Sequence, residues 1–238
     1  ARAADDIADE GQWPAADRLT QLRAFRVALR NPDDATIFNP QIFVPLHRII
    51  VEKSLPVSLL DDLLKAFEQD VMASANGSTY PNTAALLDYC QLSANPVGRL
   101  LLHLYGVHHE TALKQSDAIC SALQLINFWQ DLSEDIPRGR FYLPQDSLQQ
   151  LPTATLIETL CQHARALMLS GAPLVHQVPG RAGWELRLVV QGGLRILEKV
   201  RKLGPLALRV RPQLRAWDVP IMLSVSYTHL TLPTTPYV

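Results

Sequence analysis

Two groups of acidic residues have the spacing that places carboxylates together on one face of a helix. In the first group, within the sequence DDIAD, Asp5 and Asp9 are four residues apart, and Arg2 precedes Asp5 by three residues. Residues three or four apart are neighbours on the surface of an α-helix. The sequence therefore predicts an acidic helix face with a cationic side chain beside it near the start of the chain.

The second acidic group repeats this spacing later in the chain and is longer. Asn127, Asp131 and Asp135 follow one another at intervals of four residues, and Glu134 lies beside them. Like charges stacked on one helix face destabilise it by roughly 0.3 kcal/mol per pair. No Lys or Arg occurs between Asn127 and Asp135, so we expect a bound cation to offset the repulsion.

The chemistry that such faces support is the binding of divalent cations. Mg²⁺ prefers oxygen ligands and is often held by one or two carboxylates together with substrate phosphates. Two acidic faces opposed across a cavity would hold a diphosphate through Mg²⁺, while Arg2, Arg138 and Arg140 neutralise the remaining phosphate oxygens. A single pair of aspartates is more often a solvated face, and Asp33-Asp34 and Asp61-Asp62 are interpreted as surface or capping residues.

The elements that must position these residues are helices. Alternating strand patterns with hairpin turns are absent, glycine accounts for only 11 residues, and aromatic residues are 7% of the chain. Apolar residues instead recur at helical spacing, and proline or glycine follows most of the periodic segments. We expect one all-α domain over residues 1–224, with helices over 15–30, 36–53, 58–71, 83–104 (interrupted at Asn95-Pro96), 111–135, 153–170, 181–203 and 206–223.

Composition and charge exclude several classes of protein. The chain has 238 residues, and its 22 basic and 23 acidic residues give a net charge of -1, so we expect no nucleic-acid partner. The cysteines, Cys90, Cys120 and Cys161, are too scattered for a disulfide framework or a zinc site, which indicates a reducing compartment. No signal peptide and no apolar run of about 18 residues is visible. We expect a cytoplasmic protein, and leave open a peripheral association with the inner membrane face.

The two ends of the sequence differ from the rest. The first residue is Ala1, and the opening segment resembles the middle of a helix, so we expect an N-terminal truncation that leaves the chain poorly soluble or inactive. Residues 225–238 are rich in Thr and Pro and have no helical period. We expect this segment to be an unstructured and foreign tail whose removal changes stability very little.

Three ordered motifs resemble those of the squalene/phytoene synthase family, the head-to-head prenyl synthases. The family's Arg followed by D-D-x-x-D is matched by Arg2, Asp5, Asp6 and Asp9. Its N-x-x-[QR]-D-x-x-x-D and following G-R-x-Y-x-P are matched by Asn127, Gln130, Asp131, Asp135, Gly139, Arg140, Tyr142 and Pro144. Its Y-C-x-x-x-A-x-x-V-G is matched by Tyr89, Cys90, Ala94, Val97 and Gly98. The resemblance extends from residue 1 to about residue 223.

The resemblance implies a fold and a set of site residues. The fold is the all-α isoprenoid-synthase fold, in which both acidic faces line a central cavity. Tyr89 would point toward the diphosphate or a carbocation, although a lone buried tyrosine is otherwise usually structural. Asp70 lies where the family often has an acidic residue, with its role left open. The implied catalytic residues are Tyr89, Asp5, Asp9, Asp131 and Asp135, the same four aspartates are the implied Mg²⁺ ligands, and the implied diphosphate ligands are Arg2, Asn127, Gln130, Arg138 and Arg140.

Two segments favour one branch of the family. SANPVGRLLLHL and ELRLVVQGGLRILEKV resemble the hydroxysqualene synthases of hopanoid biosynthesis, which implies presqualene diphosphate as substrate, release of diphosphate and addition of water. Other enzymes of that pathway are implied as candidate partners. The alternatives are a squalene, phytoene or presqualene diphosphate synthase, a prenyl diphosphate hydrolase or head-to-tail synthase, and a non-catalytic helical binding protein.

Two features inside the expected helices have more than one interpretation. Asn95-Pro96 either opens its helix toward a cavity or is a packing kink. Gly192-Gly193 either allows close helix contact or leaves room for a prenyl chain.

Overall fold

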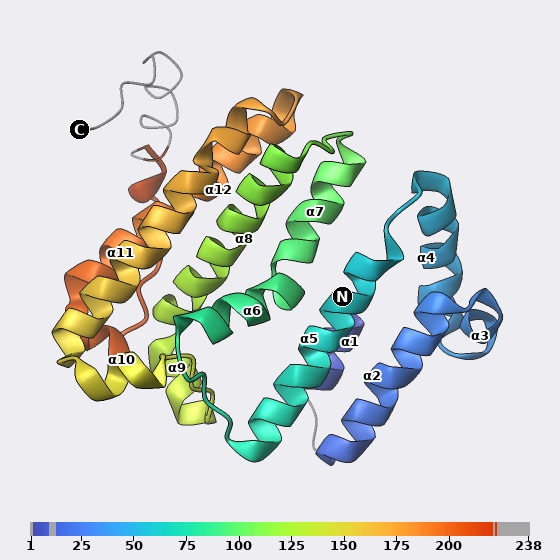
Figure 1. Ribbon diagram of the computed structural model, residues 1–238, viewed down its shortest axis with the longest axis horizontal. Helices are drawn as coiled ribbons and strands as arrows, with labels where there is room; N and C mark the ends of the chain where they lie inside the picture. Colours follow the sequence, from blue (N-terminus) through green and yellow to red (C-terminus); the bar gives the residue numbers. More distant parts are fainter. Residues whose placement is uncertain (1, 10–12, 221, 223–238) are drawn as a thin grey trace. The chain divides into compact units, whose positions relative to one another are not determined.

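The computed structural model describes residues 2–9, 13–220 and 222 (Figure 1). The chain divides into two compact units, the first formed by Ala1–His108 and Arg138–Ser147 and the second by His109–Pro137 and Leu148–Val238. The described residues form helices and no β-strand, apart from an isolated bridge between Thr79 and Phe141. This confirms the predicted all-α class. The predicted foreign tail falls on residues outside this description.

The first unit is built on seven α-helices among its described residues. Pro32, Pro40 and Pro96 lie at the first or second position of their helices, where a missing N–H leaves no hydrogen bond unmade. The helices are α1 (Arg2–Asp9), α2 (Ala15–Arg30), α3 (Pro32–Ile37), α4 (Pro40–Lys53), α5 (Val57–Asn76), α6 (Thr83–Ser93) and α7 (Asn95–Leu104).

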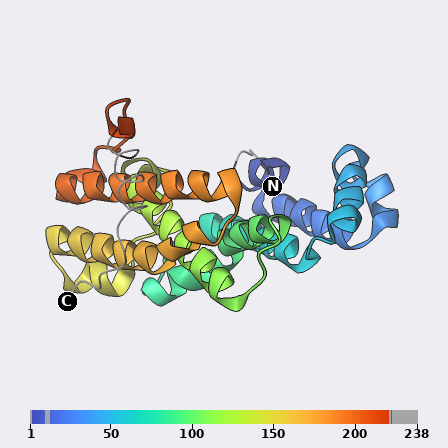
Figure 2. The same ribbon diagram turned by 90° about the horizontal axis from the view of Figure 1, so that it is seen from above.

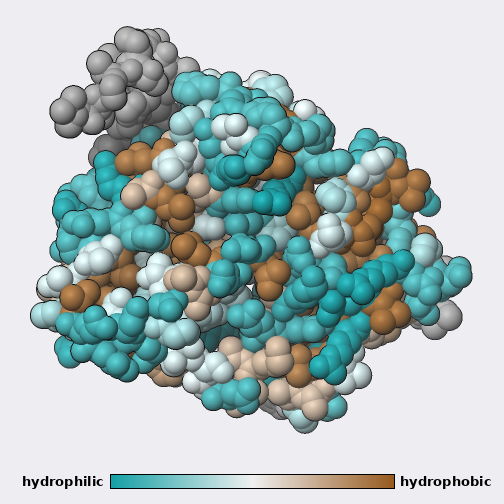
Figure 3. Space-filling model, viewed as in Figure 1, coloured by the Kyte–Doolittle hydropathy of each residue, from teal (hydrophilic) through white to brown (hydrophobic). Residues whose placement is uncertain are grey.

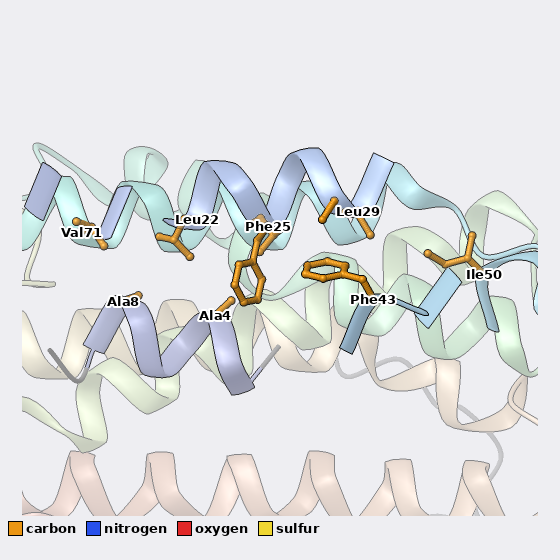
Figure 4. Close-up of a cluster of buried hydrophobic side chains, with 10 residues drawn as sticks. Ala4, Ala8, Leu22, Phe25, Leu29, Phe43, Ile50 and Val71 are labelled. Carbon is orange, nitrogen blue, oxygen red and sulfur yellow. The ribbon is translucent and has the colours of Figure 1, made fainter. Parts of the chain in front are cut away.

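A cluster of buried apolar side chains holds the first unit together (Figure 4). Phe25 of α2 packs edge-on against Phe43 of α4, with ring centroids 5.2 Å apart. Helix α1 contributes the small residues Ala4 and Ala8, four positions apart, which let α1 lie close to α2 and α5. Asp5, the residue after Ala4, lies off this buried face and is exposed to solvent.

Asp61 is buried, which contradicts its interpretation as a surface or capping residue. Only 4% of its surface is exposed. Its carboxylate accepts hydrogen bonds from Arg26 Nε at 2.9 Å and Arg30 Nη2 at 2.6 Å, and Lys65 Nζ lies 3.3 Å away. Arg26 and Arg30 lie 35 and 31 residues from Asp61 in the sequence, so local spacing gives no sign of these two partners, unlike Lys65.

Asp61 makes the stability of the first unit depend on acidic pH. Burial alone would raise the pKa of this carboxyl, but hydrogen bonds from Arg26, Arg30 and Lys65 lower it from 3.8 to about 2. A lowered folded-state pKa stabilises the protein above the unfolded value and loses that effect as the pH falls toward 2. We therefore expect the melting temperature of Asp61→Asn to lie well below wild type at pH 5, and the gap to narrow by pH 2. Asp17→Asn, at an exposed position of α2, is the control.

The interruption at Asn95-Pro96 separates α6 from α7 at Ala94. Pro96 has no N–H to donate to the carbonyl four residues earlier, so the α-helical ladder stops. The Ala94 N–H still donates to Cys90 O at 3.0 Å, and Ser93 Oγ donates to Tyr89 O at 3.1 Å. Asn95 itself is buried. The break lies about one helical turn after Tyr89, and it sets where the helix that holds Tyr89 ends.

In the second unit three long helices pack against one another, and Figures 1 and 2 show them side by side. They are α8 (Glu110–Gln130), α11 (Thr153–Gly171) and α12 (Gly180–Leu203). Residues 209–217 are not helical, so the helix predicted over 206–223 is wrong for this middle part, whereas 206–208 are 3-10 helical and 218–220 are α-helical. The elements that lie wholly or partly in this unit are α8 (Glu110–Gln130), α9 (Leu132–Asp135), η1 (Ile136–Arg138), α10 (Gln145–Gln150), α11 (Thr153–Gly171), η2 (Ala172–His176), α12 (Gly180–Leu203) and η3 (Gly204–Leu208).

Gly193 lies where α12 packs tightly against its neighbours. A Cβ atom there would lie 2.9 Å from Met168 Cε of α11 and 3.1 Å from Leu123 Cδ2 of α8. Both distances are shorter than ordinary carbon–carbon contact, so neighbouring side chains already fill the space that a side chain at this position would occupy. Of the two interpretations of Gly192-Gly193, the structure supports close helix contact at Gly193.

The surface carries apolar side chains between polar ones (Figure 3). Leu101 and Leu104 of α7, and Tyr105 directly after it, are each about half exposed. Exposed apolar residues in this number are ordinary for a globular protein. None of the described helices has both the length and the apolar character needed to cross a bilayer. Peripheral membrane association stays a prediction.

Candidate active site

The acidic stripe of the second unit follows helical register across a break in the helix. Helix α8 ends at Gln130 and α9 starts at Leu132, so the helix predicted over 111–135 is interrupted at Asp131. The Asp131 N–H nevertheless donates to Asn127 O at 2.9 Å, and the Asp135 N–H donates to Asp131 O at 2.8 Å. These i→i−4 hydrogen bonds keep the three predicted site residues on one face.

A cationic side chain from the C-terminal segment contacts this stripe. Arg211 donates from Nε to Asp131 Oδ1 at 2.5 Å and from Nη2 to Asp131 Oδ2 at 3.3 Å, and its Nε lies 3.6 Å from Glu134 Oε1. The hydrogen bond with Asp131, followed by the charges of Asp131, Glu134 and Asp135, raises the pKa of Arg211. A residue 80 positions later therefore offsets part of the acidic repulsion, and the bound cation stays a prediction.

The segment that carries Arg211 is fastened to α8 and α12. Gln130, a predicted diphosphate ligand, donates from Nε2 to the Pro212 carbonyl at 2.8 Å. Asp218, whose side chain is fully buried, accepts hydrogen bonds from Arg195 Nε at 2.7 Å and from Lys199 Nζ. These contacts fix the non-helical residues 209–215 at the end of the acidic stripe even though they form no helix of their own.

Three tyrosines and one carboxylate form the polar centre of the first unit. The hydroxyl of Tyr89 on α6 donates to Asp70 Oδ2 on α5 at 3.0 Å. The ring of Tyr80 lies 5.8 Å from that of Tyr89 and 6.0 Å from that of Tyr142. Burial, followed by the charge of Asp70, raises the pKa of Tyr89 well above its ordinary value, so the phenol keeps its proton. Asp70, whose role the sequence left open, is thus the hydrogen-bond acceptor of Tyr89.

The G-R-x-Y-x-P segment joins this centre through backbone hydrogen bonds. The N–H of Gln145 donates to Tyr80 O at 3.0 Å, and the N–H of Asp146 donates to Pro81 O at 3.1 Å. Gly139 has φ +76°, a conformation that favours glycine, which explains this position of the motif. The segment thereby places Tyr142, exposed Arg138 and half-buried Arg140 in the first unit.

The predicted site residues therefore fall into two sets. Tyr89 lies in the first unit together with Tyr142, which belongs to a different motif, and with Asp70, which the prediction had not assigned. Arg2 and Asp5 are exposed on α1, also in the first unit, and the side chain of Asp9 lies outside the described residues. The second unit holds Asn127, Gln130, Asp131 and Asp135. That the two acidic faces oppose each other across a cavity stays a prediction.

The chemistry of the second acidic stripe fits a hard divalent cation. Its donors are carboxylate and amide oxygens, and it already binds the cationic guanidinium of Arg211. Within the part of the chain that the structure describes, no three Asp, Glu, His or Cys side chains form a group that could hold a metal ion. An ion such as Mg²⁺ bound there would complete its coordination shell with water and, when substrate is present, with phosphate oxygens, which is its usual mode of binding.

An all-helical fold that carries an acidic stripe and a tyrosine centre is what the sequence motifs predict for an enzyme that acts on prenyl diphosphates, and similarity to known proteins agrees. Residues 1–218 match the squalene/phytoene synthase family. Hydroxysqualene synthase from Zymomonas mobilis is 31% identical in an alignment of 230 residues that covers 88% of this chain and 74% of that protein. Hydroxysqualene synthase from Rhodopseudomonas palustris is 30% identical over 225 residues, with the same two shares.

Solved structures support the same assignment. The crystal structure of squalene synthase HpnC from Alicyclobacillus acidocaldarius superposes with a TM-score of 0.74 at 31% identity, over 86% of this chain and 80% of that one. A dehydrosqualene synthase shares the fold with a TM-score of 0.74 at 18% identity. The chain belongs to the squalene/phytoene synthase family of head-to-head prenyl synthases. The predicted family, helical fold and enzymatic nature are thereby confirmed.

Proposed function

We propose that this protein converts presqualene diphosphate to hydroxysqualene in a Mg²⁺-dependent reaction of hopanoid biosynthesis. The observation that carries the proposal is the level of similarity within the family. Identity to the hydroxysqualene synthase of Rhodopseudomonas palustris is 30% over 225 residues, whereas identity to the presqualene diphosphate synthase of the same organism is 26% over 206 residues. The SANPVGRLLLHL segment around the buried Asn95 supports the same branch.

The charged residues would bind and polarise the diphosphate. Mg²⁺ held by Asp5, Asp9, Asp131 and Asp135 would supply Lewis-acid chemistry that withdraws charge from the leaving diphosphate. The guanidinium groups of Arg2, Arg138 and Arg140, with the amides of Asn127 and Gln130, would donate hydrogen bonds to its oxygens. The carbon–oxygen bond breaks with its electron pair on the diphosphate. The resulting carbocation rearranges, gains a water oxygen and loses a proton.

The polar centre of the first unit, formed by the three tyrosines and Asp70, would stabilise and shield the carbocation. Tyr89 keeps its proton and donates it in a hydrogen bond to Asp70, which increases the electron density of the phenol oxygen and ring. An electron-rich ring face attracts a nearby cation. Tyr80 packs against Tyr89 and also contacts Tyr142, and Tyr89 itself is buried, so bulk water has little access to that phenol. Limited access matters because water must meet the cation at one carbon only.

A second candidate function is the formation of squalene, supported by 31% identity to squalene synthase HpnC. The two functions differ in how the final carbocation is quenched, by water or by hydride.

Product analysis in isotopically labelled water distinguishes the two candidates. We expect the protein, with an upstream segment restored if the 238 residues alone are inactive, to convert presqualene diphosphate in ¹⁸O-water with Mg²⁺ and without reduced nicotinamide. The product should be hydroxysqualene that carries one ¹⁸O atom. Omission of Mg²⁺ with added chelator is the control and should abolish the reaction. Unlabelled squalene that forms only with NADPH would assign the squalene-forming reaction instead. Unchanged presqualene diphosphate under every condition would contradict both.

A further inference from the structure

We propose that Arg211 is an internal counter-ion of Asp131 that competes with divalent metal for this carboxylate. In the metal-free protein the guanidinium would occupy Asp131, and metal would bind only as that contact is given up. This inference rests on the proposed role of Asp131 as a metal ligand. It assigns to the C-terminal segment, which lies outside the three sequence motifs, a direct effect on the affinity of the acidic stripe for metal.

The contact between Arg211 and Asp131 engages both carboxylate oxygens. Two N–H groups of one guanidinium, Nε and Nη2, reach Oδ1 and Oδ2, an arrangement that is stronger and more specific than a single-point ion pair. The side chain of Asp131 is only 16% exposed and that of Arg211 35% exposed, so solvent screens the pair less than it screens a surface pair.

Arg211 and a divalent cation compete for Asp131 because both carry positive charge. This holds even if the carboxylate has lone pairs available for both. A divalent cation bound to Asp131 would lie within a few ångströms of a guanidinium that stays protonated at any working pH. Glu134 lies near the same guanidinium, with its Oε1 3.6 Å from Arg211 Nε. Metal binding to the stripe must therefore overcome the repulsion or move Arg211 away.

The anchors around Arg211 indicate that its position is built into the fold. Asp218 is fully buried and is held by Arg195 and Lys199 of α12, and Gln130 donates to the carbonyl of Pro212, the next residue after Arg211. These contacts do not involve Asp131. They would keep the segment in place when the guanidinium leaves the carboxylate, so that Arg211 can return when metal dissociates.

Titration of the full chain with Mn²⁺, followed by electron paramagnetic resonance of the free ion and without diphosphate, tests the inference. We expect Arg211→Gln to bind Mn²⁺ roughly fivefold more tightly than wild type, the upper range for one partly exposed ion pair. Arg211→Lys keeps the charge but loses the two-point contact, so it should tighten binding less. Arg209→Gln, an exposed position two residues earlier, is the matched control and should leave the affinity unchanged.

The outcomes separate this inference from the proposed function. If Arg211→Gln keeps wild-type helicity by circular dichroism and binds Mn²⁺ no more tightly than wild type, the inference is overturned. If Asp131→Asn binds Mn²⁺ as wild type does, Asp131 is not a metal ligand, and the proposed metal site and this inference both fail. If binding depends on Asp131 and not on Arg211, only this inference fails.

Discussion

Replacing Asp131 by asparagine is expected to lower turnover roughly a hundredfold or more while the helices stay folded. The substitution removes a carboxylate that would hold Mg²⁺ against the departing diphosphate, and loss of a metal-borne charge in the transition state costs several kcal/mol. It also removes the ion pair with Arg211, so stability should fall by up to about 1 kcal/mol. Turnover of presqualene diphosphate and far-UV circular dichroism of the same sample measure the two effects.

Two further variants separate loss of metal from loss of stability. Arg211→Gln removes the same ion pair from its other side and should show a comparable loss of stability. Asp62→Asn removes an ion pair with Lys65 on α5, belongs to neither acidic stripe, and should leave turnover unchanged. Wild-type turnover in Asp131→Asn at saturating substrate and Mg²⁺ would contradict the assigned role of Asp131.

The effect of Asp131→Asn on stability shows which interactions local sequence spacing can predict and which it cannot. From the stripe alone, Asp131→Asn relieves repulsion among Asn127, Asp131 and Asp135, and stability should hold or rise. The structure reverses the sign because Arg211 pairs with Asp131. Helical periodicity predicts that the three side chains share a face, but it gives no information about a partner 80 residues away.

The same limit explains the other differences between sequence and structure. Asp61 looks like a surface residue because Arg26 and Arg30, which bury its charge, come from another helix. Asp70 could be noticed but not assigned, since its partner Tyr89 is 19 residues away on α6. The helix predicted over 206–223 fails because tertiary contacts to Asp218 and Pro212 hold residues 209–215 in a non-helical path.

Sequence spacing predicts the helices of the fold more completely than it predicts the side-chain contacts within the site. The break at Asn95-Pro96 and most of the helices of both units follow from proline positions and apolar periodicity, which are local properties. Tyr80 links Tyr89 to Tyr142, and this link depends on backbone hydrogen bonds between residues 80–81 and 145–146 that join two of the family's motifs in space. No single-sequence pattern reports such a pairing.

Gly171, at the end of α11, is expected to tolerate alanine poorly. Its lack of a side chain lets α8 and α11 lie in close contact. A Cβ atom at this position would lie 2.5 Å from the carbonyl oxygen of Gln115 and 2.7 Å from Ile119 Cγ1, both on α8. The first contact is with backbone, so no side-chain rotation relieves it and the two helices must separate. Forced separation of this kind costs about 3 kcal/mol, partly offset by the roughly 1 kcal/mol by which alanine favours a helix over glycine.

We therefore expect Gly171→Ala to lower the free energy of unfolding by about 2 kcal/mol in urea denaturation. Gly192→Ala is the matched control, because a Cβ atom there would meet Met222 Cε at 3.4 Å and Leu214 Cδ1 at 3.8 Å, which are ordinary contacts. That variant should be as stable as wild type or more stable, since only the helix-propensity term acts. Equal stability of the two variants would contradict the close approach of α8 and α11 at Gly171.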